Sequence, residues 1–252
     1  MSINKQEMPR WAATIKRLNT YLTEDFLGGP KVIKMAWVIN LHKFLTVFVI
    51  AAFMVIFDNR SPAAWVYLAL HGTYGFCWLF KHIAFPDRSW ETKSTIGGAI
   101  IVFLLLATYW VAPYLLISDA LGVDSAATPS WLLALCISLH TCGVVIMMVS
   151  DGQKYFTLKF RSGLITEGMF KRIRHPNYAG EMMIYAAYAL LVQHWLPWVI
   201  LAYWWGSVFL VNMIKAEASL SRYPEWEAYK ARSGMVFPKL FRANSGQQLQ
   251  VE

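Results

Sequence analysis

The chain has 252 residues, of which 57% are apolar and 15% are charged, and its formal net charge is +8. A soluble domain carries about 25% charged residues, so this composition excludes a disordered chain and disfavours a water-soluble enzyme. An apolar chain with a basic excess is typical of a membrane protein with basic loops or, less often, of a nucleic-acid binder. The positions of the basic residues distinguish these two classes.

The first 34 residues are basic and aromatic, and they lack the apolar core of a signal peptide. Residues 9–28 are typical of an amphipathic helix that lies in the membrane interface, although a simple basic leader fits them equally well. We therefore expect a cytoplasmic or interfacial segment ahead of the first membrane span.

Six apolar runs follow this segment, and a helix needs about 20 residues to cross the core of a bilayer. Polar, turn-forming stretches separate the first four runs. The fifth run is short and could form one half of a helical hairpin with the sixth. The predicted spans are residues 35–57, 63–85, 96–118, 130–150, 179–193 and 195–214.

The basic residues follow the order of these spans. Of the 23 lysines and arginines, 21 lie in segments that six spans would place on one side, namely 1–36, 81–95, 151–178 and 215–252. The opposite loops hold Arg60 and the acidic Asp119 and Asp124. This is the positive-inside pattern, so both termini are expected in the cytoplasm and nucleic acid is not needed to explain the charge.

Several polar side chains lie inside the predicted spans, where desolvation makes them costly and therefore candidates for function. The first span carries His42 and Lys43, the second carries His71 and Tyr74 on one helix face, and the fourth carries His140. Lys43 could instead reach the interface by extending its side chain, and a single buried histidine is more often a structural hydrogen-bonding group. Together they favour an internal polar cavity.

Metal chemistry is disfavoured, because the six histidines show none of the spacings that place two ligands on one helical face. The chain also has no P-loop, no nucleophile elbow and no Rossmann glycine fingerprint. The known soluble nucleotide-binding motifs are therefore absent from the sequence.

The densest functional signal lies in residues 168–181. Basic residues precede a His-Pro-Asn-Tyr turn, which in turn precedes a predicted helix at the membrane surface. Arginine, histidine and a helix N-terminus together suit an anionic ligand such as a nucleotide phosphate. A positive-inside loop that ends in a proline turn explains the same residues equally well.

The stretch Arg174-His-Pro-Asn-Tyr-Ala-Gly-Glu181 resembles the Arg-His-Pro-Asn-Tyr-x-Gly-Glu/Asp motif of the steroid 5-alpha-reductases, the sterol reductases and related uncharacterised bacterial membrane proteins. Residues 150–160 and 215–238 resemble the other parts of their nucleotide site, and residues 70–90 resemble the bacterial subgroup. The resemblance covers residues 65–240 and is most specific in its last third.

A second family shares much of this motif. Isoprenylcysteine carboxyl methyltransferases and phospholipid methyltransferases carry Arg-His-Pro-x-Tyr-x-Gly and bind S-adenosylmethionine with a similar C-terminal segment. Glu181 after the glycine, and Ala216 where the methyltransferases tend to carry a first glutamate before Glu217, favour the reductases. We therefore expect a reductase, with a methyltransferase as the alternative and a non-catalytic lipid-binding protein as a third class.

The reductase resemblance implies NADPH as the cofactor and hydride transfer to an activated C=C bond of a lipophilic steroid-, sterol- or isoprenoid-like substrate. Tyr74, assisted by His71, would protonate the substrate, although the acidic partner that the steroid reductases place in an earlier span is missing. The residues expected to bind the cofactor are Asp151, Lys154, Arg172, Arg174, His175, Asn177, Tyr178, Glu181, Lys215, Glu217, Arg222, Trp226 and Tyr229.

The expected fold is an all-α integral membrane protein with about six transmembrane helices and a short C-terminal cytoplasmic helix. Residues 35–150 would hold the substrate cavity and residues 151–242 the nucleotide site, followed by a flexible tail at 243–252. The expected partners are a lipophilic substrate and membrane lipids. The resemblance to the bacterial subgroup favours a bacterial inner membrane over the endoplasmic reticulum, with the active site facing the cytoplasm.

Overall fold

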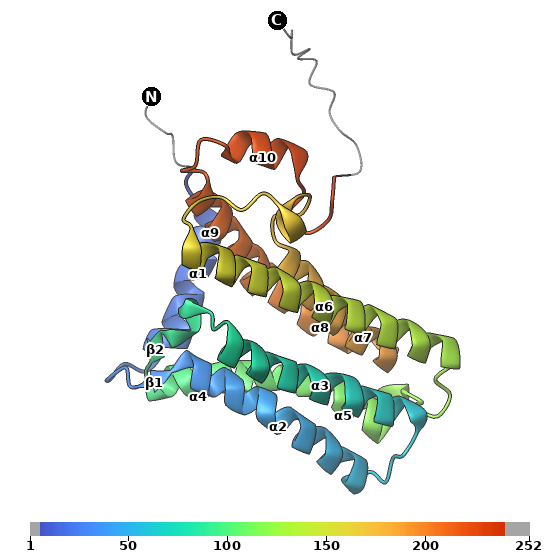
Figure 1. The fold of residues 1–252 in the computed structure, drawn as a ribbon. Helices are drawn as coiled ribbons and strands as arrows, with labels where there is room; N and C mark the ends of the chain where they lie inside the picture. The colour runs from blue at the N-terminus through green and yellow to red at the C-terminus, as the bar shows by residue number, and fades with distance from the viewer. Residues whose placement is uncertain (1–5, 240–252) are drawn as a thin grey trace, which may run out of the picture.

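The computed structural model describes residues 6–239, and these residues are mostly helical (Figure 1). The expected tail at residues 243–252 lies outside the described part of the chain. The helices are α1 (Arg10–Thr20), α2 (Met35–Ile56), α3 (Pro62–Ala84), α4 (Ile96–Ala107), α5 (Val111–Ser118), α6 (Ser130–Phe160), α7 (Pro176–Val192), α8 (Trp195–Trp204), α9 (Leu210–Leu220) and α10 (Trp226–Arg232). A short 3-10 turn at Thr108–Trp110 joins α4 to α5, and a short π turn at Trp205–Phe209 joins α8 to α9, so that each pair continues as one rod.

Four helical segments are long and apolar enough to cross a membrane: Met35–Ile56, Ile96–Ser118, Ser130–Phe160 and Trp195–Leu220. The structure therefore supports a multi-pass membrane protein and not the full expected count of six. The fifth predicted span, α7, is 17 residues long. The second, α3, is long enough, but its polar residues lower its mean hydropathy. The side of the membrane on which the termini lie is not established.

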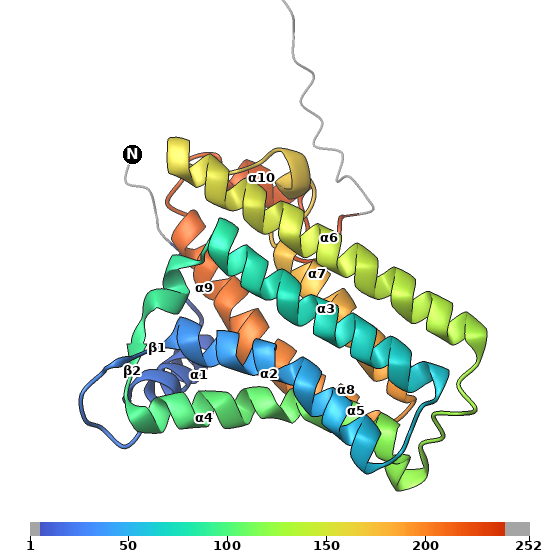
Figure 2. The same cartoon turned by 60° about the horizontal axis from the view of Figure 1, so that its bottom comes forward.

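The helices form one bundle with a cap at one end. Helices α2 and α3 lie side by side, α4 and α5 pack against α2, and α7 packs along α6 (Figures 1 and 2). Helix α10 lies across the end where α6 finishes and α7 begins (Figure 1). One small antiparallel pair of strands, β1 (Ile33–Lys34) and β2 (Lys93–Ser94), was not expected and ties the start of α2 to the start of α4.

Local sequence explains where these helices begin. Ser61 accepts a hydrogen bond from the Ala64 amide ahead of Pro62, the first residue of α3, and Thr95 accepts one from Gly98 at the start of α4. A hydroxyl at this position satisfies an amide that has no partner inside the helix. Pro176 starts α7, because proline is pre-set for the first helical turn.

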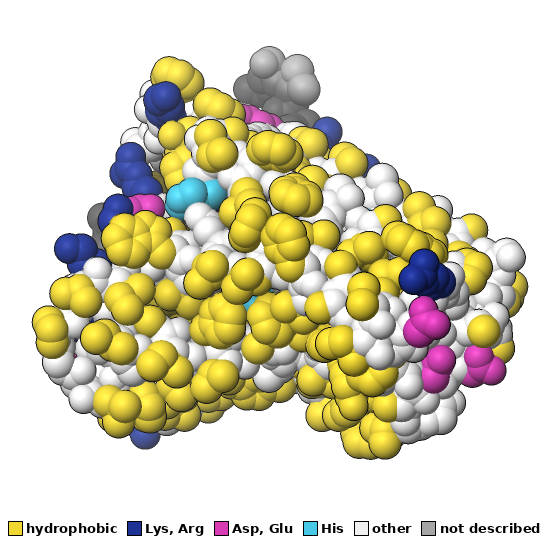
Figure 3. Space-filling view, turned by 90° about the horizontal axis from the view of Figure 1, so that it is seen from below, with side chains coloured by type: hydrophobic (Ala, Val, Ile, Leu, Met, Phe, Trp, Pro, Cys, Tyr) yellow, Lys and Arg dark blue, Asp and Glu magenta, His cyan; other side chains and the backbone are white. Residues whose placement is uncertain are grey.

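The outer surface of the bundle is apolar. Figure 3 shows hydrophobic side chains over most of one face of the molecule, and large apolar residues such as Val55, Ile83 and Trp131 are more than two-thirds exposed. In water such a surface would promote aggregation, whereas in a bilayer it faces lipid tails. The surface and the four long apolar segments are therefore explained by the same membrane environment.

Candidate functional site

The residues before α7 are held by the C-terminal segment. The Arg174 amide donates to the Gly234 carbonyl (2.9 Å), and the His175 amide donates to the Met235 carbonyl (3.0 Å). The Gly234 amide in turn donates to the Arg172 carbonyl (2.9 Å). These bonds form a short parallel bridge, so the motif is fixed by a segment about 60 residues further along the chain.

Arg174 is the centre of a buried cluster of side chains, which we call the Arg174 cluster (Arg174, His175, Glu217, Trp226 and Tyr229). Its Nε donates to Glu217 Oε1 at 2.6 Å, and its Nη1 donates to the Ser233 carbonyl at 2.5 Å. The guanidinium also lies 5.9 Å from the Trp226 ring centroid. Both charged residues are only 8% exposed, so the pair is desolvated and each partner depends on the other.

Two polar atoms of this cluster are left without partners. His175 Nε2 lies 3.5 Å from Glu217 Oε1. It makes no hydrogen bond within residues 6–239, and neither does Trp226 Nε1. Both side chains are buried. Since a buried polar group without a partner costs free energy, these atoms are available to a bound ligand.

Tyr229 joins the cluster to the loop that precedes the motif. Its hydroxyl donates to the Phe170 carbonyl at 2.6 Å, and both groups are buried. Burial raises the pKa of Tyr229 to about 12, so the phenol is a neutral donor at physiological pH. Tyr229 therefore holds the loop against α10.

We expect Tyr229→Phe to destabilise the protein by about 1–2 kcal/mol, because the Phe170 carbonyl would lose its donor and stay buried. Thermal unfolding of the detergent-solubilised variant measures this loss. Tyr223→Phe is the matched control, since Tyr223 bonds to the exposed Arg222 and its loss should leave the unfolding temperature nearly unchanged. Equal unfolding temperatures for the two variants would contradict this role of Tyr229.

A cleft of about 400 Å³ opens between the end of α3 and α6. Asp151 forms a buried ion pair with Lys81 on its wall, and Lys154 lines its mouth. Glu181 is half-buried on α7, and the charges of Lys81, Asp151, Lys43 and Asp87 act on it. Glu181 makes no hydrogen bond or ion pair to any described side chain.

Tyr178 connects the cleft to the Arg174 cluster. Its ring centroid is 6.0 Å from that of His175 and 4.9 Å from that of Phe209, in edge-to-face contacts. The charges of Asp87 and Asp151, which line the cleft, act on its hydroxyl. Asn177 precedes it in the first turn of α7 and is half-buried.

The structure does not bring three of the expected basic residues to this site. Arg172 is exposed, and Arg222 is exposed and bonds to Ser219 and Tyr223. Lys215 lies on the α1 side of α9, where it lines a separate cleft with Lys16. Burial, followed by repulsion from Lys215, lowers the pKa of Lys16.

The residues expected to be catalytic also lie elsewhere. His71 and Tyr74 are fully buried in α3, inside the first part of the bundle. The His71 ring stacks on Tyr188, and neither of its nitrogens has a hydrogen-bond partner among the described residues. Tyr74 packs against Tyr185 and lies beneath the ammonium of Lys43.

Sequence reasoning missed three residues that complete these sites. Lys81 neutralises Asp151, the Ser233 carbonyl accepts from Arg174, and Tyr185 accepts from Lys43. Lys81 carried a signal, because a lysine at the end of a predicted span can face inward as well as outward. Ser233 carried none, because its backbone carbonyl and not its side chain is the main partner.

Comparison with known proteins places a family match on this part of the chain. The phospholipid methyltransferase family model matches residues 129–221, which is less than half of the chain. An uncharacterised protein of Schizosaccharomyces pombe is 38% identical over 56 residues, covering 22% of this chain and 19% of the relative. A second from the same yeast is 30% identical over 94 residues, covering 34% and 27%. No solved structure matches.

The matched segments are short relative to these relatives, since they cover about a quarter or less of the length of each. Both relatives are fission-yeast proteins, so the comparisons give the expected bacterial inner membrane no support. The family match runs from the start of α6 to the end of α9 and contains Arg174, His175 and Glu217.

The expected enzyme class, an NADPH-dependent oxidoreductase acting on CH–CH groups, is contradicted by the methyltransferase match. The expectation rested on Glu181 and Ala216, two positions in a motif that both families share. NADPH has no support in the comparisons, whereas the enzymes of the matched family use S-adenosylmethionine. The sequence and the structure agree that the chain is a membrane protein.

Proposed function

We propose that this protein is an S-adenosylmethionine-dependent membrane methyltransferase that acts on a lipophilic acceptor. The observation that carries the proposal is the methyltransferase match over residues 129–221, a stretch that contains Arg174, His175 and Glu217, which meet in one buried cluster. The proposed site would face the cytoplasm, because its residues belong to the basic segments 151–178 and 215–239.

The groups in the Arg174 cluster suit this methyl donor. A zwitterionic nucleoside ligand needs hydrogen-bond acceptors for its ribose hydroxyls and ammonium, donors for its carboxylate and an aromatic surface for its base. Glu217 supplies a carboxylate held in place by Arg174, and Trp226 and His175 supply unpaired polar atoms. Tyr178 supplies an aromatic ring at the side of the cluster that faces the cleft.

The bound donor supplies an electrophilic methyl group on a positively charged sulfur. The chain's own residues would bind and orient it and accept the proton that a nucleophilic acceptor loses. Glu181 suits the second task, because its carboxylate has no competing hydrogen bond within the described residues and lies near the cleft. Lys81 and Asp151 form the wall along which that proton would reach the cytoplasm.

In this scheme the two parts of the chain have separate tasks. Residues 151–242 would bind the donor, and residues 35–150 would hold the lipophilic acceptor between membrane helices. A phospholipid is the first acceptor to test, because the matched family is described by that substrate. An isoprenylated cysteine derivative is the second.

Ligand-dependent thermal unfolding tests the donor. S-adenosylmethionine at about 100 times its Kd should stabilise the purified protein by about 2.7 kcal/mol, whereas NADPH should not stabilise it. Transfer of a tritiated methyl group into extracted lipid then measures turnover. Arg222→Ala is the control, since this exposed residue lies outside the cluster and the variant should keep the full shift.

Stabilisation by NADPH and not by S-adenosylmethionine would overturn the proposal. Failure of both nucleotides to bind would favour a non-catalytic lipid-binding protein with the same fold, because fold alone does not fix function.

A further inference from the structure

A lysine lies buried in the first membrane-spanning helix. Lys43 of α2 is 4% exposed, and it points inward and not toward the membrane interface. Its Nζ donates to the Tyr185 hydroxyl at 3.0 Å. The same ammonium lies 4.3 Å from the centroid of the Tyr74 ring and 5.2 Å from that of Trp78.

All of these contacts are neutral. Within residues 6–239, no carboxylate oxygen lies within 4.0 Å of Lys43 Nζ. The charges that act on Lys43 are those of Glu181, one helical turn before Tyr185 on α7, and of Lys81, which is paired with Asp151. A cation that is buried without a contacting anion is costly, so Lys43 has capacity for a negatively charged ligand atom.

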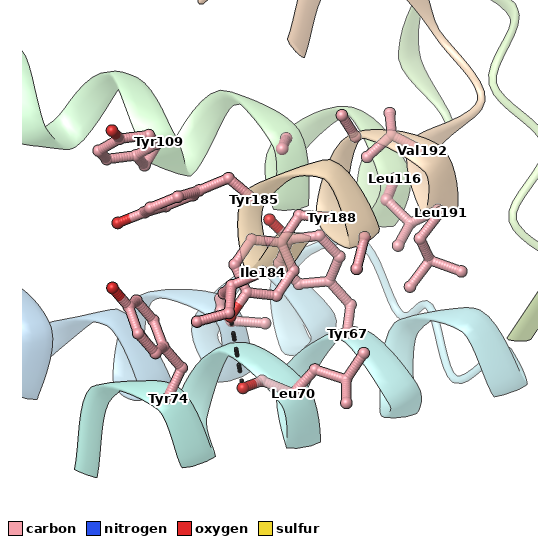
Figure 4. Packing of buried hydrophobic residues seen from close by; sticks show 14 of the residues in the cluster. Tyr67, Leu70, Tyr74, Tyr109, Leu116, Ile184, Tyr185, Tyr188, Leu191 and Val192 are labelled. Atoms are coloured by element: carbon pink, nitrogen blue, oxygen red, sulfur yellow. Dashed lines mark hydrogen bonds between the residues drawn. The ribbon is translucent and has the colours of Figure 1, made fainter. Parts of the chain in front are cut away.

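Phenol hydroxyls gather at the same place. Tyr74 lies on α3, Tyr109 in the 3-10 turn between α4 and α5, and Tyr185 on α7. Their hydroxyl groups project to the same side, away from the aliphatic residues Leu191 and Val192 (Figure 4). Tyr74 Oη is buried and has no hydrogen-bond partner among the described residues. Each phenol can donate a hydrogen bond to an oxygen placed beside Lys43.

A small cavity lies beside two of these tyrosines. A cavity of about 20 Å³ is lined by Tyr109 and Tyr185 and, on the α5 and α8 side, by Ala112, Pro197 and Leu201. The regular α-helix is interrupted at Thr108–Trp110, and Thr108 and Tyr109 of this turn line the cavity. Such interruptions are frequent at functional sites.

We propose that Lys43, Tyr74 and Tyr185 form a binding site for the acidic oxygen of a lipophilic ligand, a carboxylate on a long apolar chain. The carboxylate would take the charge-assisted hydrogen bond of Lys43 and the free hydroxyl of Tyr74, and its apolar chain would lie within the membrane, which α2 is long and apolar enough to cross. The site is separate from the Arg174 cluster, and the inference is independent of the proposed methyl transfer.

Binding of cis-parinaric acid, a fluorescent carboxylate with an 18-carbon chain, tests this site in the full-length protein without any methyl donor. The acid should bind at least about tenfold more tightly than its methyl ester, because a hydrogen bond to a charged group is the difference between them. Lys43→Met should remove this preference for the acid, whereas Lys43→Arg should keep it. Lys171→Met, which removes an exposed lysine, is the matched control.

Glu181→Gln should change binding of the acid in the opposite direction to Lys43→Met. If Lys43 binds an anion, removing the neighbouring negative charge should tighten binding of the acid and leave binding of the ester unchanged. Equal binding of acid and ester by the parent protein, or an unchanged preference in Lys43→Met, would overturn the proposal. Weaker acid binding in Glu181→Gln would do the same. Because no donor is present, these results do not depend on the outcome with S-adenosylmethionine.

Discussion

Replacing Glu217 with glutamine should abolish binding of S-adenosylmethionine and destabilise the protein by about 3–5 kcal/mol, because Arg174 would remain buried without its anion. The Ser233 carbonyl would still accept from the guanidinium, but a carbonyl does not neutralise its charge. Thermal unfolding with and without the donor measures both effects in one experiment.

A double variant separates stability from function. Arg174→Met combined with Glu217→Leu removes both charges and should recover most of the lost stability, since replacing a buried ion pair with apolar residues is often neutral. Binding of the donor should stay absent, because the carboxylate and the guanidinium are both gone. Glu225→Gln is the matched control for the single change, as this exposed glutamate lies just before α10.

Donor binding that survives in Glu217→Gln would show that the Arg174 cluster serves the fold alone. In that case the cleft beside Lys81 and Asp151 and the cleft beside Lys16 and Lys215 would be the places left to test for the nucleotide among the described residues.

Hydrophobicity predicted the helical class. The motif resemblance placed Arg174, Glu217, Trp226 and Tyr229 in one expected site. These residues meet because the C-terminal segment returns to the loop before α7, an arrangement that the shared motif of both families already implied. The same sharing explains why the enzyme class was wrong. A motif common to two families identifies a kind of site, and a single glutamate after it does not identify the ligand.

The direction in which a side chain faces was harder to predict. Lys215 and Glu217 are two positions apart, so they are rotated by about 200° around α9 and cannot both face one ligand. Glu217 points to Arg174, and Lys215 lies toward α1. Similarly, mean hydropathy does not show whether a lysine within a span, such as Lys43, extends to the interface or packs inward. That choice depends on Tyr185 and Tyr74, which come from other helices.

The second large effect is expected where α6 and α7 touch. Gly143 and Gly180 face each other there, and a Cβ added at Gly143 would lie 2.6 Å from the Gly180 carbonyl oxygen. A Cβ added at Gly180 would lie 2.6 Å from the Gly143 carbonyl oxygen and 2.7 Å from the Met147 amide nitrogen. Because these neighbours are backbone atoms, neither helix can relieve the clash by a change of rotamer.

Gly180→Ala should therefore destabilise the protein by about 3 kcal/mol, at the upper end of the usual cost of overpacking, and Gly143→Ala should do the same. Pro176 begins α7 directly after His175, so a shift of this helix would also displace the Arg174 cluster. Thermal unfolding should show the loss of stability, and the stabilisation by S-adenosylmethionine should fall in parallel.

Gly206→Ala is the control that makes this test specific, since a Cβ at Gly206 meets no atom within 4 Å. In a helical segment that change should be neutral or slightly stabilising, because alanine loses less conformational entropy than glycine on folding. If Gly180→Ala unfolds at the temperature of Gly206→Ala, the two helices are not in backbone contact. The position of the motif would then depend on the C-terminal segment alone, and Ser233 and Gly234 would become the residues whose replacement releases Arg174.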